Sequence, residues 1–138
     1  MTTTTVPPPI TVTQPDHDRL SDIAETVGSR APGGQRLADE MLRARVVAPG
    51  KIAPSVVTMN ADVEFVDDQT RQVRRVTLVY PESADILNGK ISVLTPIGAA
   101  LIGLSEGQSM EWQTLDGERK TLTVLKVHQP EANRLSER

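Results

Sequence analysis

The sequence is 138 residues long and 38% hydrophobic, with no cysteine and a formal net charge of -3. This length suits one small domain, or a small domain with a helical appendage. The acidic balance argues against a nucleic-acid-binding protein that works through a basic face. The absence of cysteine excludes disulfides and cysteine-based zinc sites and fits a cytoplasmic protein. No apolar run is long enough for a membrane span.

Residues 1–9 are mostly threonine and proline, so we expect them to be disordered or extended. Thr13 and Asp16 then have the spacing of a capping box, which predicts the start of a helix that ends at Gly28. Its apolar residues recur at helical spacing: Leu20, Ile23, Ala24 and Val27. A second helix is expected over residues 35–46, with Leu37, Ala38, Met41 and Ala44 facing inwards. Residues 10–47 therefore predict a short antiparallel helical hairpin, each helix about 20 Å long at ~1.5 Å per residue.

The tip of this hairpin is the glycine-rich and proline-rich segment 28–34, which cannot remain helical. Its central residues are Ser29, Arg30 and Ala31, and the segment carries no carboxylate. Residues 48–54 contain two prolines and one glycine and predict a linker to the second half of the chain.

The second half, residues 55–132, has the pattern of a small sheet, followed by a tail at 133–138. We expect strands at residues 56–59, 62–66, 72–80, 110–113 and 121–127. Residues 67–70 predict a turn, and Asp116-Gly117 predicts a two-residue hairpin turn. The predicted fold class is α+β: a helical hairpin followed by an antiparallel sheet wrapped on one short helix.

That short helix belongs to residues 91–103, Ile-Ser-Val-Leu-Thr-Pro-Ile-Gly-Ala-Ala-Leu-Ile-Gly. Ile91 and Val93 predict a strand that ends at Thr95, because the residue before a proline favours extended geometry. Pro96 can begin a helix, and Gly103 can end it. The expected apolar side consists of Ile97, Leu101 and Ile102. Such a short helix is stable only against a sheet.

The residues suggest no catalytic or metal-binding site, and we expect neither a cofactor nor a metal. His17 and His128 lack the spacing of metal ligands. Asp67 and Asp68 could form an acidic pair, but between two strands they fit a turn better. The basic cluster consists of Arg71, Arg74 and Arg75, whose alternation favours a solvated sheet edge over a nucleic-acid site.

Residues 91–103 resemble the signature of the C-terminal domain of the transcript cleavage factors GreA and GreB. Three further stretches narrow the resemblance: Val-Val-Thr-Met-Asn at 56–60, Thr-Leu-Val-Tyr-Pro at 77–81 and Gln-Pro-Glu-Ala at 129–132. Together they resemble the regulator of nucleoside diphosphate kinase (Rnk) family, a GreA/GreB-like family with a short coiled coil. The resemblance implies an FKBP-like C-terminal domain that docks on RNA polymerase at the rim of the secondary channel, with the hairpin directed into the channel.

Gre factors cleave backtracked RNA by presenting acidic residues at the tip of a long coiled coil, where they help to hold a magnesium ion of the polymerase. The tip of this chain lacks a carboxylate and its hairpin is short. The resemblance therefore implies a non-enzymatic transcription regulator that competes with Gre factors without stimulating cleavage. Prolyl isomerase activity is not expected, because one Phe, one Tyr and one Trp cannot line an FKBP pocket. The alternative is an interaction module that binds nucleoside diphosphate kinase directly.

In Gre factors the turn between strand and helix contacts polymerase, so the resemblance assigns Ser92, Leu94, Thr95 and Pro96 to the binding surface. Leu94 departs from the family pattern, which has a polar residue at this position. Thr95 and Pro96 could instead only cap the helix. An exposed Leu94 would favour the binding role. We expect Leu94→Asp to weaken polymerase binding without lowering thermal stability.

Overall fold

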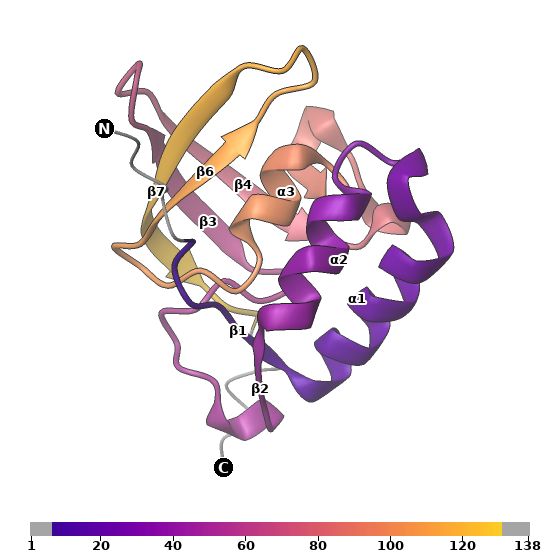
Figure 1. Ribbon diagram of the computed structural model, residues 1–138. Helices are drawn as coiled ribbons and strands as arrows, with labels where there is room; N and C mark the ends of the chain where they lie inside the picture. Colours follow the sequence, from indigo (N-terminus) through magenta and orange to yellow (C-terminus); the bar gives the residue numbers. More distant parts are fainter. Residues whose placement is uncertain (1–6, 131–138) are drawn as a thin grey trace, which may run out of the picture.

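The computed structural model describes residues 7–130. Two helices lie on one side of the molecule, a curled five-stranded sheet lies on the other, and helix α3 lies between them (Figure 1). Residues 1–6 of the expected disordered start, and the whole expected tail, lie outside the described residues. Residues 7–9 have no regular secondary structure.

The first helix, α1 (Gln14–Val27), follows directly from the short strand β1 (Thr11–Thr13). The Thr13 side chain caps it by accepting a hydrogen bond from the Asp16 backbone N–H at 3.4 Å. Leu20 and Ala24 are buried on its inner face, as the spacing predicts. A 3-10 turn (Gly28–Arg30) separates α1 from the second helix, α2 (Gly34–Arg43).

The sequence prediction extended α2 to residue 46, and the structure shows that this is wrong. Ala44 is already extended, with φ -67° and ψ 142°. Strand β2 (Arg45–Val47) follows it and pairs in parallel with β1, so that Val12 lies opposite Val46. The β-branched residues Val46 and Val47 favour an extended backbone over a helix. Pairing with β1 then supplies hydrogen-bond partners for the backbone N–H and C=O groups of this segment. The two strands therefore join the start of α1 to the end of α2.

The larger sheet has the strand order β5-β4-β3-β7-β6. Its strands are β3 (Asp62–Asp67), β4 (Val73–Val79), β5 (Lys90–Ser92), β6 (Ser109–Gln113) and β7 (Arg119–His128). The expected alternation in β3 is confirmed, because Val63 and Phe65 are buried while Asp62 and Glu64 are not. The sheet is not purely antiparallel, since β5 pairs in parallel with β4. The chain makes this possible by crossing through two 3-10 turns, Pro81–Ser83 and Ile86–Asn88, before it enters β5.

Two further predictions about the sheet need correction. Residues 56–59 are not a strand: they form only one bridge, Val56 with Ser105, and Val57 exchanges backbone hydrogen bonds with the segment that leaves α3. The turn between β6 and β7 is a three-residue loop, because the Thr114 N–H donates to the Glu118 carbonyl at 2.8 Å. Gly117 closes this loop with φ +89°, a conformation that suits glycine.

Helix α3 (Pro96–Leu101) lies at the centre of one hydrophobic core to which both parts of the chain contribute. Leu20 and Leu37 enter this core from the hairpin, and Phe65 and Leu78 enter it from the sheet. Because α3 packs against both α2 and β6, its small residues face inwards: Ala99 and Ala100 are fully buried, together with Leu101 and Ile102, whereas Ile97 is only half-buried. The predicted apolar side is therefore confirmed at Leu101 and Ile102, with Ile97 partly buried against the core, and Ala99 and Ala100 add to it.

The expected linker, residues 48–54, follows a defined path. It contains a 3-10 turn (Pro49–Lys51), and Ile52 is buried. The Gln129 side-chain amide fixes its far end by donating to the carbonyls of Ala53 and Val56 at 2.7 and 3.0 Å.

Candidate functional site

The four residues assigned to polymerase binding lie together in the turn between β5 and α3, and each is half-buried. The Ser92 hydroxyl accepts a hydrogen bond from the Leu94 N–H at 3.0 Å. The Thr95 hydroxyl donates to the Ser92 carbonyl at 2.7 Å and accepts from the Gly98 N–H at 3.1 Å. This confirms the capping role of Thr95, with Pro96 in the first turn of the helix. The hydroxyl groups of Ser92 and Thr95 are thus both used in hydrogen bonds within the turn.

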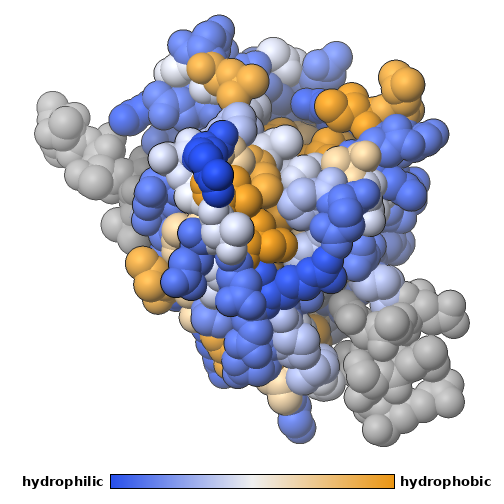
Figure 2. Space-filling model, turned by 90° about the vertical axis from the view of Figure 1, so that its right-hand side faces the viewer, coloured by the Kyte–Doolittle hydropathy of each residue, from blue (hydrophilic) through white to orange (hydrophobic). Residues whose placement is uncertain are grey.

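Leu94 is not the exposed residue on which the sequence-based mutant prediction depended. Its side chain packs against the core and, with Ile23 and Val27 of α1 and with Pro81, lines a hollow of about 280 Å³. Figure 2 shows the molecule from the side of α1, where a strip of hydrophobic surface lies between hydrophilic residues. A carboxylate at position 94 would therefore be placed against apolar side chains and would lower stability.

The hairpin tip, residues 28–34, is fastened to this same turn. The Gly33 N–H donates to the Leu94 carbonyl at 2.7 Å. A Cβ atom on Gly33 would lie 2.5 Å from the Thr95 carbonyl oxygen and 2.6 Å from the Leu94 carbonyl oxygen, so only glycine allows this approach. We call this contact the tip clasp. It brings together the two segments that the sequence assigned to separate roles.

Of the three central residues of the tip, Ser29 and Arg30 are exposed and Ala31 is half-buried. Arg30 does not extend outwards, because its guanidinium donates to the Thr26 carbonyl at 2.5 Å and to the Val27 carbonyl at 3.2 Å. It thereby satisfies carbonyls at the C-terminal end of α1, where a positive charge is also favourable.

A second contact fastens the hairpin to the sheet near the start of α1. The Tyr80 hydroxyl donates to the Asp16 carboxylate at 2.9 Å, and the Arg19 guanidinium lies 3.7 Å from the centre of the Tyr80 ring. Arg19 also pairs with Glu82. Burial, together with the adjacent Asp16 charge, raises the pKa of Tyr80.

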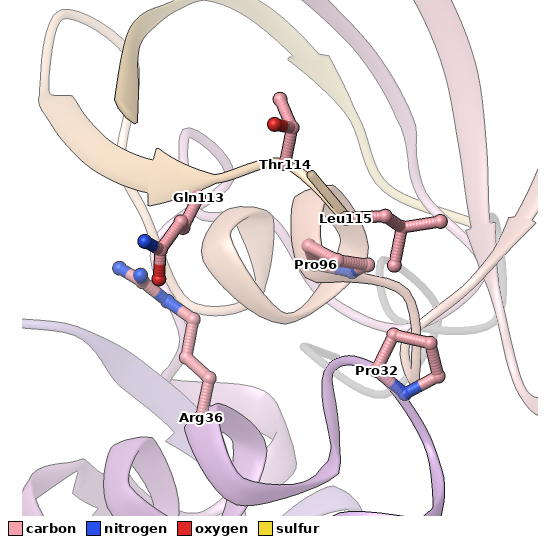
Figure 3. A pocket seen from close by; sticks show the side chains of 6 residues that line it. All are labelled: Pro32, Arg36, Pro96, Gln113, Thr114 and Leu115. Carbon is pink, nitrogen blue, oxygen red and sulfur yellow. The ribbon is translucent and has the colours of Figure 1, made fainter. Parts of the chain in front are cut away.

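A groove runs beside the tip clasp, between the tip, the start of α3 and the β6–β7 loop. It consists of two adjoining hollows of about 320 and 490 Å³, both lined by Pro32, Pro96, Thr114 and Leu115. Arg36 borders only the smaller hollow and Asp116 only the larger one. Ile97 and Trp112 complete the apolar lining of the larger hollow. We call this surface the tip groove; Figure 3 shows the smaller hollow and the residues around it.

Arg36 is the charged residue at one end of the tip groove. Figure 3 shows its guanidinium pointing toward Gln113. Its Nε is buried without a hydrogen-bond partner among the described residues. Burial lowers the pKa of Arg36 from its usual range, and the negative charge of Glu40 opposes this shift. The guanidinium remains protonated, as arginine does in proteins. Glu40 itself is held by Arg43 at 2.8 and 2.9 Å, so it does not pair with Arg36.

The described residues hold no group of three or more His, Asp or Glu side chains that could bind a metal ion. Asp67 forms a turn, as expected, by accepting hydrogen bonds from the backbone N–H groups of Gln69 and Thr70 at 2.9 and 3.2 Å. His17 contacts the Met41 carbonyl at 2.9 Å. Within residues 7–130, no helix is both long and apolar enough to cross a membrane.

Comparison with known proteins identifies the family. A family model described as "Transcription elongation factor, GreA/GreB, C-term" matches residues 52–129, and one described as "Rnk N-terminus" matches residues 8–47. The "Regulator of nucleoside diphosphate kinase" of Escherichia coli (strain K12) is 36% identical over 127 residues, which cover 91% of this chain and 93% of the relative. The chain belongs to the Rnk family.

The Rnk family relationship extends to Gre factors. The "Transcription elongation factor GreA" of Thermodesulfovibrio yellowstonii is 36% identical over 100 residues, 68% of this chain and 63% of that GreA. Among solved structures, the "Prokaryotic transcription elongation factor GreA/GreB from Nitrosomonas europaea" aligns with a TM-score of 0.71 and 38% identity, covering 88% of this chain and 99% of that one. These comparisons confirm the family resemblance and the α+β fold class predicted from the sequence.

Sequence reasoning correctly predicted that α3 of this Rnk-family chain begins at Pro96, but it extended the preceding strand to Thr95, whereas β5 ends at Ser92. It also missed the residues around this turn. Gly33 was treated only as a helix breaker, although two consecutive glycines also suggest a close backbone approach. Leu115 is an apolar residue in a polar turn, which was the available signal for the tip groove. Arg36 and Trp112 gave no such signal, because they meet there only through the tertiary fold.

Proposed function

We propose that this Rnk-family protein binds RNA polymerase at the rim of the secondary channel, competes there with Gre factors and does not stimulate transcript cleavage. The observation that carries the proposal is the tip of the hairpin, which has no carboxylate and is fastened to the 92–96 turn through Gly33. A regulator of this kind acts by occupying a site on polymerase in the cytoplasm, without chemistry of its own.

Both the length of the hairpin and the charge of its tip support the proposed absence of transcript cleavage. Helix α1 has 14 residues, which is about 21 Å at ~1.5 Å per residue. The tip segment lies against the domain that carries the docking turn, so even this length does not project freely beyond it. The charged side chain of the tip is Arg30, which folds back onto the end of α1. A magnesium ion needs oxygen ligands, and this tip offers it no carboxylate.

The surface that remains open for docking is the outer side of the 92–96 turn and the adjoining tip groove. Pro96 belongs to both, which makes it the centre of the proposed interface. The internal hydrogen bonds of Ser92 and Thr95 preorganise the turn, so little conformational entropy is lost when it binds.

The proposal is tested by measuring binding of the purified protein to core RNA polymerase, with GreA added as competitor. Saturable binding that GreA displaces is the expected result. Backtracked complexes are treated in parallel with this protein or with GreA as the positive control, and their RNA is sized. RNA shortening in the presence of this protein would overturn the predicted absence of cleavage, and failure to bind polymerase would overturn the proposed site.

A second candidate function is direct binding of nucleoside diphosphate kinase. It is favoured by the name of the E. coli relative, "Regulator of nucleoside diphosphate kinase". Co-purification separates the two functions, because polymerase subunits are recovered under the first and the kinase under the second.

A further inference from the structure

We infer that the tip groove binds an extended segment of the partner protein, which inserts an apolar side chain beside Pro96 and Leu115 and places a carboxylate on Arg36. The inference rests on the proposed function, because the partner tested is RNA polymerase, and it adds the chemistry that the partner must present. It also assigns a binding role to residues outside the 92–96 turn.

The apolar part of the argument begins with Leu115. This side chain is 79% exposed at the end of the β6–β7 loop, where a polar residue would be better solvated. It stands beside the rings of Pro32 and Pro96, and the larger hollow continues to Trp112, which is half-buried. An exposed apolar hollow with an aromatic residue and rigid prolines is typical of the centre of a protein interface.

The charged part of the argument is Arg36. Its Nε is buried without a hydrogen-bond partner among the described residues, while the charges of Glu40, Glu111 and Asp39 partly stabilise the guanidinium. A buried, unpaired guanidinium atom costs free energy in the unbound protein. A carboxylate bound in the tip groove would instead meet the guanidinium where it lines the smaller hollow, and a fork-like pair between these groups is the strong form of this interaction. The position therefore favours an Asp or Glu side chain in the partner.

The two ends of the tip groove differ in charge, which sets the direction of the bound segment. Arg36 borders one hollow and Asp116 the other. The partner segment is therefore expected to carry its acidic residue at the Arg36 end and a neutral or basic residue at the Asp116 end. An RNA or DNA strand does not fit this pattern, because its phosphates would approach Asp116 on a protein whose net charge is -3.

The test compares the affinities of four variants for core RNA polymerase. Leu115→Ser removes the exposed apolar side chain, and its matched control is Leu42→Ser, an 87% exposed leucine on α2 that does not line the tip groove. We expect Leu115→Ser to weaken binding about tenfold, as for a central interface residue, and Leu42→Ser to leave it unchanged. Arg36→Gln should weaken binding and reduce its salt dependence. Arg36→Lys should keep more of the affinity and of the salt dependence than Arg36→Gln, because lysine retains the positive charge but lacks the two-pronged guanidinium.

A second measurement locates the partner directly. Because the chain has no cysteine, Leu115→Cys can be labelled at one position with a polarity-sensitive fluorophore, and Leu42→Cys serves as the control. Polymerase should shift the emission of the label at position 115 and leave that at position 42 unchanged.

The two ideas fail in different ways. If the unmodified protein does not bind polymerase, the proposed function and the inference are both overturned. If it binds and is displaced by GreA, while Leu115→Ser and Arg36→Gln bind with unchanged affinity, the proposed function stands and the tip groove is not its interface.

Discussion

The tip clasp makes Gly33→Ala the most informative single substitution in this chain. Gly33 has φ -101° and ψ 3°, which other residues also adopt, so alanine adds no backbone strain. The effect is instead steric, because the added methyl group would lie 2.5 Å from the Thr95 carbonyl oxygen, 2.6 Å from that of Leu94 and 2.7 Å from the Thr95 carbonyl carbon. All three are backbone atoms, and relief of the clash requires the tip to move away from α3.

The cost follows from three terms. Forcing a methyl group into a filled site costs about 1–3 kcal/mol. Loss of the Gly33 to Leu94 hydrogen bond costs about 1 kcal/mol more. Reduced freedom of the unfolded chain returns about 0.4–1 kcal/mol. We therefore expect Gly33→Ala to lower the free energy of unfolding by about 2 kcal/mol.

Urea denaturation measures this difference, and amide hydrogen exchange shows where it arises. Gly28→Ala is the matched control: Gly28 has φ +55°, and an added Cβ meets nothing within 4 Å. It should cost about 1–3 kcal/mol through backbone strain alone, because φ +55° with ψ -140° is a glycine conformation, and it should leave the Gly33 amide protected. In Gly33→Ala the amide at position 33 should lose its protection. A Gly33→Ala protein with wild-type stability, or with a protected amide at position 33, would refute the tip clasp.

Three further predictions concern single side chains. Thr13→Ala should lower the free energy of unfolding by about 1 kcal/mol, because it removes the cap of α1; urea denaturation tests this, and an unchanged midpoint would contradict it. Tyr80→Phe should cost about 1 kcal/mol through the lost hydrogen bond to Asp16. The pKa of Tyr80 is raised in the folded protein, so the stabilisation by Tyr80 is complete below the unfolded pKa of about 10 and is lost as the pH rises above that value. Denaturation at neutral and alkaline pH should therefore show that the free energy of unfolding falls with pH in the wild type and falls less in Tyr80→Phe. Equal falls in the two proteins would contradict the assignment. Leu94→Asp should lower the melting temperature because Leu94 is half-buried, and an unchanged melting temperature would show that the position tolerates a charge.

Local sequence signals predicted the parts of the fold that depend on neighbouring residues. The caps at Thr13 and Thr95 each form with a residue three positions along the chain, so spacing alone identifies them. The alternation of Val63 and Phe65 likewise fixed the inner face of β3. Caps and strand alternation depend only on residues a few positions apart, so they can be predicted from a short stretch of sequence.

The missed features depend on residues far apart in sequence. β1 and β2 have three residues each, and each pairs with a strand distant in sequence, so neither has a distinct pattern of its own. The partial burial of Leu94 was not predicted, because it depends on packing against the core and on α1, with which Leu94 lines a shared hollow; the packing direction of α1 cannot be derived from its own sequence. The tip groove requires Arg36, Pro96 and Leu115 to meet from three segments. Only its unusual apolar turn residue could be noticed beforehand.

The parallel pairing of β1 with β2 has a consequence for how the protein opens. These strands bracket α1 and α2, and β1 is also joined to the exit of α3 by the Thr11 N–H, which donates to the Gly103 carbonyl at 3.1 Å. The hairpin is thus attached to the rest of the molecule at its base as well as at its tip. We expect the slowest-exchanging amides of both helices and of the sheet to open with one common free energy, so that the molecule behaves as a single cooperative unit.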